Sequence, residues 1–132
     1  MTSWQLLFAG MTARDFKGIP SIQEVECWGH GLKPEVKLMS LKLFNSFDNS
    51  VLASLNIYTN TCLTYSDFSS CVVNNIDTHK SRLKILVHDL EEGDSRRYGC
   101  KLTVLDSEGD ASDLKWSIVV TRISEYLRHC TL

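Results

Sequence analysis

Long apolar runs are absent from this 132-residue sequence. No run approaches the roughly 18–20 apolar residues that a membrane-spanning helix needs, so we expect no span in this segment. A basic stripe is also lacking, because the net charge is −2 and the 14 basic residues are spread along the chain, which argues against nucleic acid as a partner. Hydrophobic residues still make up 43% of the sequence, which excludes an intrinsically disordered chain.

Motifs of metal binding and catalysis are missing as well. The sequence contains no Cys-x-x-Cys pair, and no histidine lies at ligand spacing from two cysteines, so we expect no metal site of the zinc type. His30, His79, His88 and His129 are scattered, and none accompanies a Ser or Cys nucleophile in a recognisable motif. There is no glycine-rich phosphate loop. We therefore predict a protein that is not an enzyme and needs no cofactor.

The cysteine content indicates an extracellular domain. The five cysteines are Cys27, Cys62, Cys71, Cys100 and Cys130. This number is high for a cytosolic domain and moderate for a secreted one, whose disulfides persist in an oxidising compartment. The odd count leaves one thiol over, and we expect Cys130 to be unpaired or bonded to another chain. Asn-x-Ser/Thr glycosylation sites are absent, which argues mildly against secretion.

Short segments of alternating hydrophobicity recur along the chain. They cover residues 23–28, 36–44, 51–58, 82–88, 97–105 and 114–122, with Gly, Asn, Asp and Ser between them. Val25 and Cys27 share one face of the first segment, and Met39, Leu41 and Leu43 share one face of the second. Residues 60–79 are the least regular part, and a helix is predicted only for residues 124–129. Seven or eight short strands predict an all-β sandwich or barrel.

The spacing of residues before Cys100 is specific. It reads Leu83-x-Ile85-x-Val87-x-Asp89-Leu90-x-x-x-Asp94-x-x-x-Tyr98-x-Cys100. A strand, a turn with Asp, and Tyr two residues before Cys are typical of the tyrosine corner in immunoglobulin domains. We expect the Tyr98 ring to be buried and its hydroxyl to hydrogen-bond to backbone a few residues upstream, with Asp94 in the turn.

The same pattern suggests a partner for Cys100. Cys100 should reach the opposite sheet, where Cys27 ends an earlier strand. The long separation of the two cysteines suits a variable-like or intermediate-like immunoglobulin sandwich, with two antiparallel sheets in Greek-key order. The alternative is that both are merely buried thiols. Leu41 and Leu43 stand where antibody-type domains carry a tryptophan on the third strand, so antibody and receptor variable domains are poor relatives.

A narrower resemblance rests on four sequence features. They are Cys27, the run Ser40-Leu41-Lys42-Leu43, the run Leu52-Ala53-Ser54-Leu55-Asn56, and Tyr98-x-Cys100. Over residues 21–121 the chain resembles the immunoglobulin domains of molluscan fibrinogen-related proteins. The resemblance implies a secreted haemolymph lectin that takes part in recognising parasites and microbes. The fibrinogen-like domain of that family has no counterpart here, so its ligand chemistry does not transfer.

Two further features lie outside that pattern. Cys62 and Cys71 are predicted to form a second disulfide that staples an irregular crossover; a rigid binding finger and two free thiols are the alternatives. The loop 106–113 has acids at alternating positions, as a calcium loop does, but an EF-hand needs Gly at the sixth position and Glu at the twelfth. Ala111 and Ser117 occupy those positions, so we expect a solvated hairpin tip without metal. Because variable domains present a binding loop there, it is also the first candidate for partner contact; its acids are Asp106, Glu108, Asp110 and Asp113.

Residues 1–20 are expected to be an N-terminal arm or first strand, residues 21–122 the immunoglobulin-like domain, and residues 123–132 a tail or linker to a further domain. The apolar segment 4–10 is either an edge strand or the remnant of a signal sequence.

The sequence thus predicts a secreted innate-immune recognition module that binds a protein or glycan, including pathogen-derived ones. The alternative is the ectodomain of an adhesion molecule or receptor, and a virus-encoded or intracellular domain is a third class. Homo-oligomers through Cys130 or an edge strand are a further hypothesis.

Overall fold

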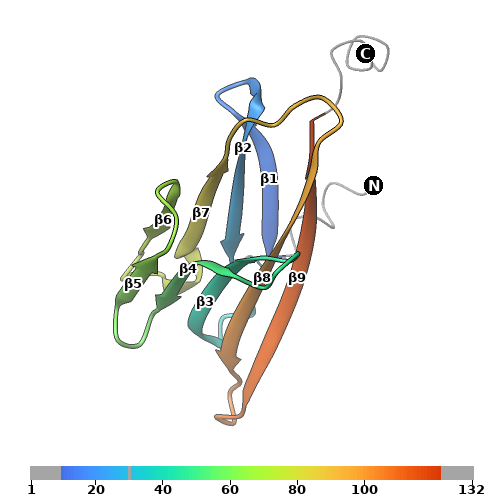
Figure 1. Ribbon diagram of the computed structural model, residues 1–132. Helices are drawn as coiled ribbons and strands as arrows, with labels where there is room; N and C mark the ends of the chain where they lie inside the picture. The colour runs from blue at the N-terminus through green and yellow to red at the C-terminus, as the bar shows by residue number, and fades with distance from the viewer. Residues whose placement is uncertain (1–9, 30, 123–132) are drawn as a thin grey trace.

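The computed structural model describes residues 10–29 and 31–122, which form nine antiparallel strands and one short 3-10 helix (Figure 1). The elements are β1 (Met11–Phe16), β2 (Ile19–Trp28), β3 (Lys37–Asn45), β4 (Val51–Asn56), β5 (Thr61–Thr64), β6 (Ser69–Val72), η1 (Thr78–Lys80), β7 (Arg82–Val87), β8 (Ser95–Leu105) and β9 (Ala111–Thr121). Within the described ranges, no helix is long and apolar enough to cross a membrane.

The strands divide into two sheets. Sheet A has the order β1-β2-β7-β6, and sheet B has the order β5-β4-β3-β8-β9. Four strands facing five, with β4 and β5 as additional strands beside β3 in the larger sheet, is the arrangement of a variable-type immunoglobulin sandwich. The predicted all-β immunoglobulin-like fold is therefore confirmed.

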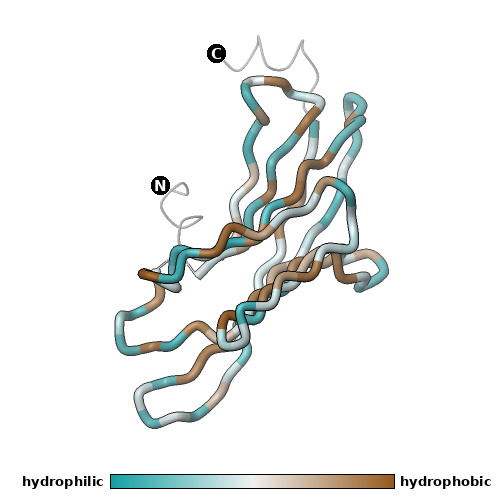
Figure 2. The backbone as a smooth tube through the Cα atoms, turned by 90° about the vertical axis from the view of Figure 1, so that its left-hand side faces the viewer, coloured by the Kyte–Doolittle hydropathy of each residue, from teal (hydrophilic) through white to brown (hydrophobic). Residues whose placement is uncertain are grey.

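The core lies between the two sheets, because alternate residues of each strand point inward. Hydrophobic and hydrophilic residues alternate along the strands in Figure 2. Side chains from both sheets meet there, and Val25, Cys27, Leu43, Leu83 and Cys100 are completely buried. Burying a leucine of this kind contributes roughly 1.5–3 kcal/mol relative to leaving it exposed.

Two of the nine strands in the described residues were not predicted from the sequence. They are β5 and β6, which occupy the region 60–79 that was expected to be irregular; β1 lies within residues 1–20, where an arm or a first strand was expected. Both are edge strands, and every residue of β5 is exposed. A short edge strand with little buried surface shows little alternation in its sequence.

One register and several strand boundaries also differ from the prediction. A register shift between Leu38 and Ser40 turns Met39 outward, so Leu38 joins Leu41 and Leu43 in the core in its place. Strand β9 begins at Ala111, so Asp113 lies in a strand and not in the loop 106–113. Strand β1 falls inside the segment 1–20, and β2 begins two residues before position 21. The predictions for residues 4–9, for a helix at 124–129 and for Cys130 lie outside the described residues.

Candidate functional site

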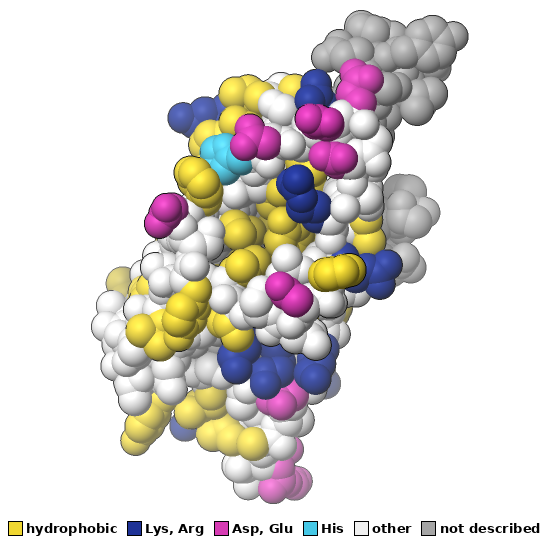
Figure 3. Space-filling model, in the orientation of Figure 1, with side chains coloured by type: hydrophobic (Ala, Val, Ile, Leu, Met, Phe, Trp, Pro, Cys, Tyr) yellow, Lys and Arg dark blue, Asp and Glu magenta, His cyan; other side chains and the backbone are white. Residues whose placement is uncertain are grey.

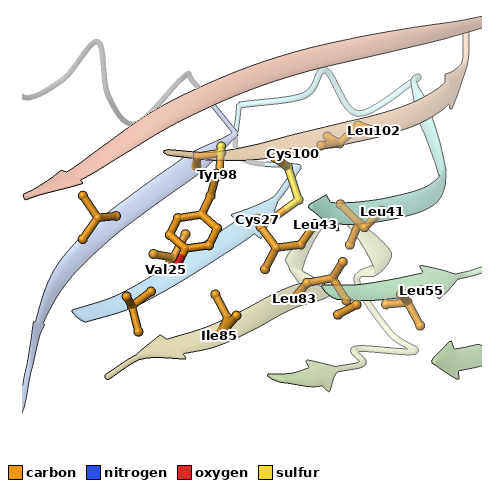
Figure 4. Packing of buried hydrophobic residues seen from close by; sticks show 14 of the residues in the cluster. Val25, Cys27, Leu41, Leu43, Leu55, Leu83, Ile85, Tyr98, Cys100 and Leu102 are labelled. Atoms are coloured by element: carbon orange, nitrogen blue, oxygen red, sulfur yellow. A yellow bond between two sulfur atoms is a disulfide. The ribbon is translucent and has the colours of Figure 1, made fainter. Parts of the chain in front are cut away.

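The two sheets are joined through their centre by a disulfide between Cys27 of β2 and Cys100 of β8, whose Cα atoms are 5.6 Å apart. Leu41 and Leu43 lie beside it in Figure 4, in the space that a tryptophan fills in antibody domains. Trp28 faces the outside of sheet A, where the guanidinium of Arg82 lies 5.3 Å from its ring centroid. The structure therefore joins the predicted pair Cys27 and Cys100.

A second disulfide joins Cys62 of β5 to Cys71 of β6. Because β5 belongs to sheet B and β6 to sheet A, this bond fastens the two sheets at one edge of the sandwich. It therefore does more than staple an irregular crossover. Tyr65 and Phe68, in the connection between the two cysteines, are both more than half exposed.

The turn before β8 departs from the expected tyrosine corner. Asp94 accepts a hydrogen bond from the backbone N–H of Glu91 at 3.0 Å, so this carboxylate does hold the turn. Tyr98 is buried, and its ring extends between the sheets toward Val25 (Figure 4). Burial raises the pKa of Tyr98, an effect that the charge of Arg96 partly offsets. Among the described residues, however, no hydrogen-bond partner for the Tyr98 hydroxyl is found, which contradicts the expected bond to backbone.

The hairpin tip between β8 and β9 is acidic and ordered by its own backbone. The carboxylate of Asp106 accepts hydrogen bonds from the N–H groups of Glu108 and Asp110, each at 2.9 Å. The three carboxylates offer oxygens within 4.8 Å of one another, and all three residues are exposed. Asp113 is separate from them: it lies in β9 and accepts a hydrogen bond from the Thr103 hydroxyl at 2.8 Å. Exposed acidic groups of this kind are common without an ion, so the tip alone assigns no metal.

Two arginines on the outer face of sheet A pair with carboxylates. Arg14 donates two hydrogen bonds to Glu24, at 2.7 and 3.0 Å, and Arg82 donates one to Glu26 at 3.0 Å. Both carboxylates are buried beneath these partners. Burial would raise the pKa of Glu24, but the hydrogen bond from Arg14 and the charges of Lys84 and Arg14 outweigh it and hold that pKa below its usual value.

The outer face of sheet B carries basic groups that are not paired in this way. Lys42, Lys101 and Lys115 are direct cross-strand neighbours on β3, β8 and β9; we call them the lysine row. Lys101 approaches Asp113 at 4.0 Å. Within residues 10–29 and 31–122, neither Lys42 nor Lys115 forms an ion pair. Lys and Arg side chains gather over the lower half of β8 and β9 in Figure 3.

A shallow hollow accompanies the lysine row. It has a volume of about 200 Å³, and besides the three lysines it is lined by Phe44, Asn49 and Val51. Phe44 is half-buried because its ring covers Gly99, its partner on β8. A second hollow of about 640 Å³ lies nearer the other end of the same face, beside Arg97, Val119 and the exposed ring of Phe47. The outer face of sheet B thus combines positive charge, one half-buried and one exposed aromatic ring, and concave surface.

Sequence reasoning missed the lysine row altogether. Each lysine occupies an outward position of a predicted strand, so its exposure could be read from the alternation. Their proximity could not, because it depends on which residues pair between strands. The basic residues therefore looked scattered along the sequence, whereas the sheet gathers three of them.

Comparisons with known proteins support the fold. No protein-family model matches the chain, and no curated protein matches its sequence. Among solved structures, the chain is similar to murine CRIg, an immunoglobulin-superfamily domain, with a TM-score of 0.56 and 10% sequence identity. The alignment covers 87% of this chain and 98% of that one. At this identity the likeness shows the immunoglobulin-like fold, and it does not reach the narrower resemblance to molluscan fibrinogen-related proteins.

Proposed function

We propose that this chain is a non-catalytic recognition module of an extracellular protein, and that it binds its partner with the outer face of sheet B. The observation that carries the proposal is the difference between the two outer faces. Sheet A covers its buried carboxylates with arginines, whereas sheet B leaves Lys42 and Lys115 without ion pairs among the described residues. Unpaired charge on an accessible face is what a partner of opposite charge recognises.

Both histidines within the described residues are engaged in contacts that fit a structural role. The ring of His79 hydrogen-bonds to the backbone carbonyl of Val36, and the ring of His88 lies against Phe68, with centroids 4.0 Å apart. Neither histidine is therefore placed to activate a Ser or Cys nucleophile. An extracellular location is supported by two disulfides that join the sheets, since such bonds persist in oxidising compartments.

The narrower role remains a hypothesis with two forms. The resemblance to molluscan fibrinogen-related proteins favours a secreted innate-immune module that binds glycans or proteins of pathogens. The fold by itself favours equally the ectodomain of an adhesion molecule or receptor, because this sandwich hosts many functions. The acidic tip at Asp106, Glu108 and Asp110 is a second contact surface in either case, since variable domains present binding loops at that end.

The proposal is tested by placing a bulky glycan on one face at a time. Ser117→Asn with Val119→Thr creates an acceptor site on the outer face of sheet B, and Lys84→Asn with Leu86→Thr creates the matched site on sheet A. The two substituted positions of each variant flank an isoleucine that faces the core, so both glycans project outward. The chain has no Asn-x-Ser/Thr site of its own, so each variant gains a single such site.

Fluorescent tetramers of the chain and of both variants are then incubated with a panel of bacteria and a panel of animal cells. We expect the glycan on sheet B to abolish binding and the glycan on sheet A to leave it unchanged. Binding to microbes would favour the innate-immune form, and binding to animal cells the adhesion form. Loss of binding with the sheet A glycan alone would refute the proposal. The unglycosylated forms of the same variants, made in the bacterial periplasm, control for the substitutions themselves.

A further inference from the structure

We infer that the lysine row and the hollow beside it form a binding site for a linear acidic carbohydrate whose sulfate or carboxylate groups lie along the three lysines. This inference rests on the proposed function, because it names the ligand class of the same face. It concerns one specific part of that face, namely the hollow lined by the row and by Phe44, Asn49 and Val51.

The geometry of the row follows from the register of sheet B. Lys101 is the direct partner of Lys42 on one side and of Lys115 on the other. Neighbouring strands lie about 4.8 Å apart, so the row runs for about 10 Å across the strands. A single sulfate or phosphate cannot contact three ammonium groups over that length. A chain with repeated acidic groups can.

The electrostatic repulsion within the lysine row supports a role in ligand binding. Like charges directly opposite each other on neighbouring strands destabilise a sheet. Asp113, at 4.0 Å from Lys101, offsets only part of this repulsion, and it already accepts a hydrogen bond from Thr103. On sheet A the same molecule places a carboxylate beside its arginines. A bound polyanion would supply the missing negative charge on sheet B.

The other groups of the hollow favour a carbohydrate over an acidic peptide. The Phe44 ring is held in place over Gly99 and offers an apolar surface on which the C–H face of a sugar ring can lie. Asn49 can both donate and accept hydrogen bonds, as sugar hydroxyls require. Lysine acts as a point charge with rotatable donors, which suits sulfate or carboxylate groups on a flexible chain. The core of a protein interface, by contrast, is depleted in charged residues such as these.

The direct test measures binding of size-defined heparin oligosaccharides to the intact chain by isothermal titration calorimetry. In the row variant, Lys42, Lys101 and Lys115 are all replaced by Gln. In the control variant, Lys17, Lys33 and Lys80, which are exposed elsewhere, are replaced by Gln. Both variants lose three positive charges. A difference between them therefore reports the position of the charges and not their number.

We expect the row variant to lose at least about tenfold in affinity and the control variant to lose less than about threefold. Removing the repulsion within the row should also raise the midpoint of urea unfolding in the row variant, which shows that it still folds. Equal losses in the two variants, or no binding of any acidic glycan by the unmodified chain, would overturn the inference.

Further ligands distinguish the chemical sources. Heparin tests sulfate groups, polysialic acid tests carboxylates alone, and neutral dextran should not bind. Binding of either acidic glycan that depends on the row supports the inference. Poly-glutamate that binds more tightly than both glycans would show instead an acidic-peptide site and overturn it.

The two proposals can fail separately. If the glycan at Ser117 blocks binding to cells but the row variant binds those cells normally, the sheet B face is functional and the carbohydrate inference is wrong. If heparin binding depends on the row but cell binding survives a glycan on sheet B, the inference holds and the proposed function fails.

Discussion

The ring of Phe44 on β3 covers Gly99 on β8, and a Cβ atom at position 99 would overlap two atoms of that ring. The two residues are direct cross-strand partners on the outer face of sheet B. An aromatic ring that covers a glycine on the neighbouring strand compensates for the missing side chain. This contact also positions the ring that lines the hollow beside the lysine row.

Substitution of Gly99 by alanine should therefore destabilise the protein, by about 1–3 kcal/mol, because the ring must move. The sign of this change in the free energy of unfolding is informative, because Gly→Ala inside a strand ordinarily stabilises a protein by roughly 0.5–1 kcal/mol. Urea unfolding of Gly99→Ala, Phe44→Ala and the double variant forms a thermodynamic cycle. We expect Gly99→Ala to be tolerated once Phe44 is truncated. A Gly99→Ala variant more stable than the parent would show that the ring moves away freely.

The two disulfides should differ in their contribution to stability. In the chain-entropy model, replacing Cys27 and Cys100 with alanine costs roughly 4 kcal/mol, whereas replacing Cys62 and Cys71 costs roughly 2.5 kcal/mol, because the closed loops span 73 and 9 positions. Guanidinium unfolding of the two double variants measures both values. Unfolding that dithiothreitol leaves unchanged in the parent chain would contradict the prediction and remove the main support for an extracellular location.

Tyr98→Phe should cost less than about 0.5 kcal/mol, because no hydrogen bond to the hydroxyl is present among the described residues. Asp94→Ala should cost about 1 kcal/mol, because its carboxylate accepts the N–H of Glu91 in the turn. Thermal unfolding of both variants checks this order. A loss above about 1.5 kcal/mol in Tyr98→Phe would indicate that the hydroxyl does bond to backbone in solution, as in an ordinary tyrosine corner.

Glu24 should make stability depend on pH. Its pKa in the folded protein lies below the usual value of about 4.5, so the unfolded chain binds more protons in the window just below that value. Stability therefore decreases as the pH falls from about 4.5 through the folded pKa. Urea unfolding at a series of pH values should show a smaller acid-side decrease for Glu24→Gln than for the parent chain. Identical pH slopes would show that Glu24 contributes nothing.

Residues close together in the chain carried most of the successful predictions. The alternation around Val25, Leu41 and Leu83 identified the strands that contribute to the core, and the spacing of Tyr98 and Cys100 identified the immunoglobulin fold. The predictions were weakest at the edges. Strands β5 and β6 are four residues long and expose most of their side chains, so no buried face imposes a pattern on them.

Register-dependent features were not accessible from the sequence. The register shift that exchanges Met39 for Leu38 in the core depends on how β3 pairs with β8. Whether the Tyr98 hydroxyl meets backbone of the described turn depends on the position of the turn relative to the ring. Both features depend on the relative positions of segments that are distant in the chain. The local sequence pattern carries no information about those positions.

The sequence by itself predicted the sandwich, because the period-2 pattern of its strands indicates an all-β fold and the Tyr-x-Cys spacing is typical of immunoglobulin domains; both are local properties. Only the tertiary structure decided where charge gathers. Lys42, Lys101 and Lys115 are far apart in the chain, and the pairing of β3 with β8 and of β8 with β9 makes them neighbours. Strand register is set by packing of the whole core, so the candidate binding surface emerges only when the two sheets have formed.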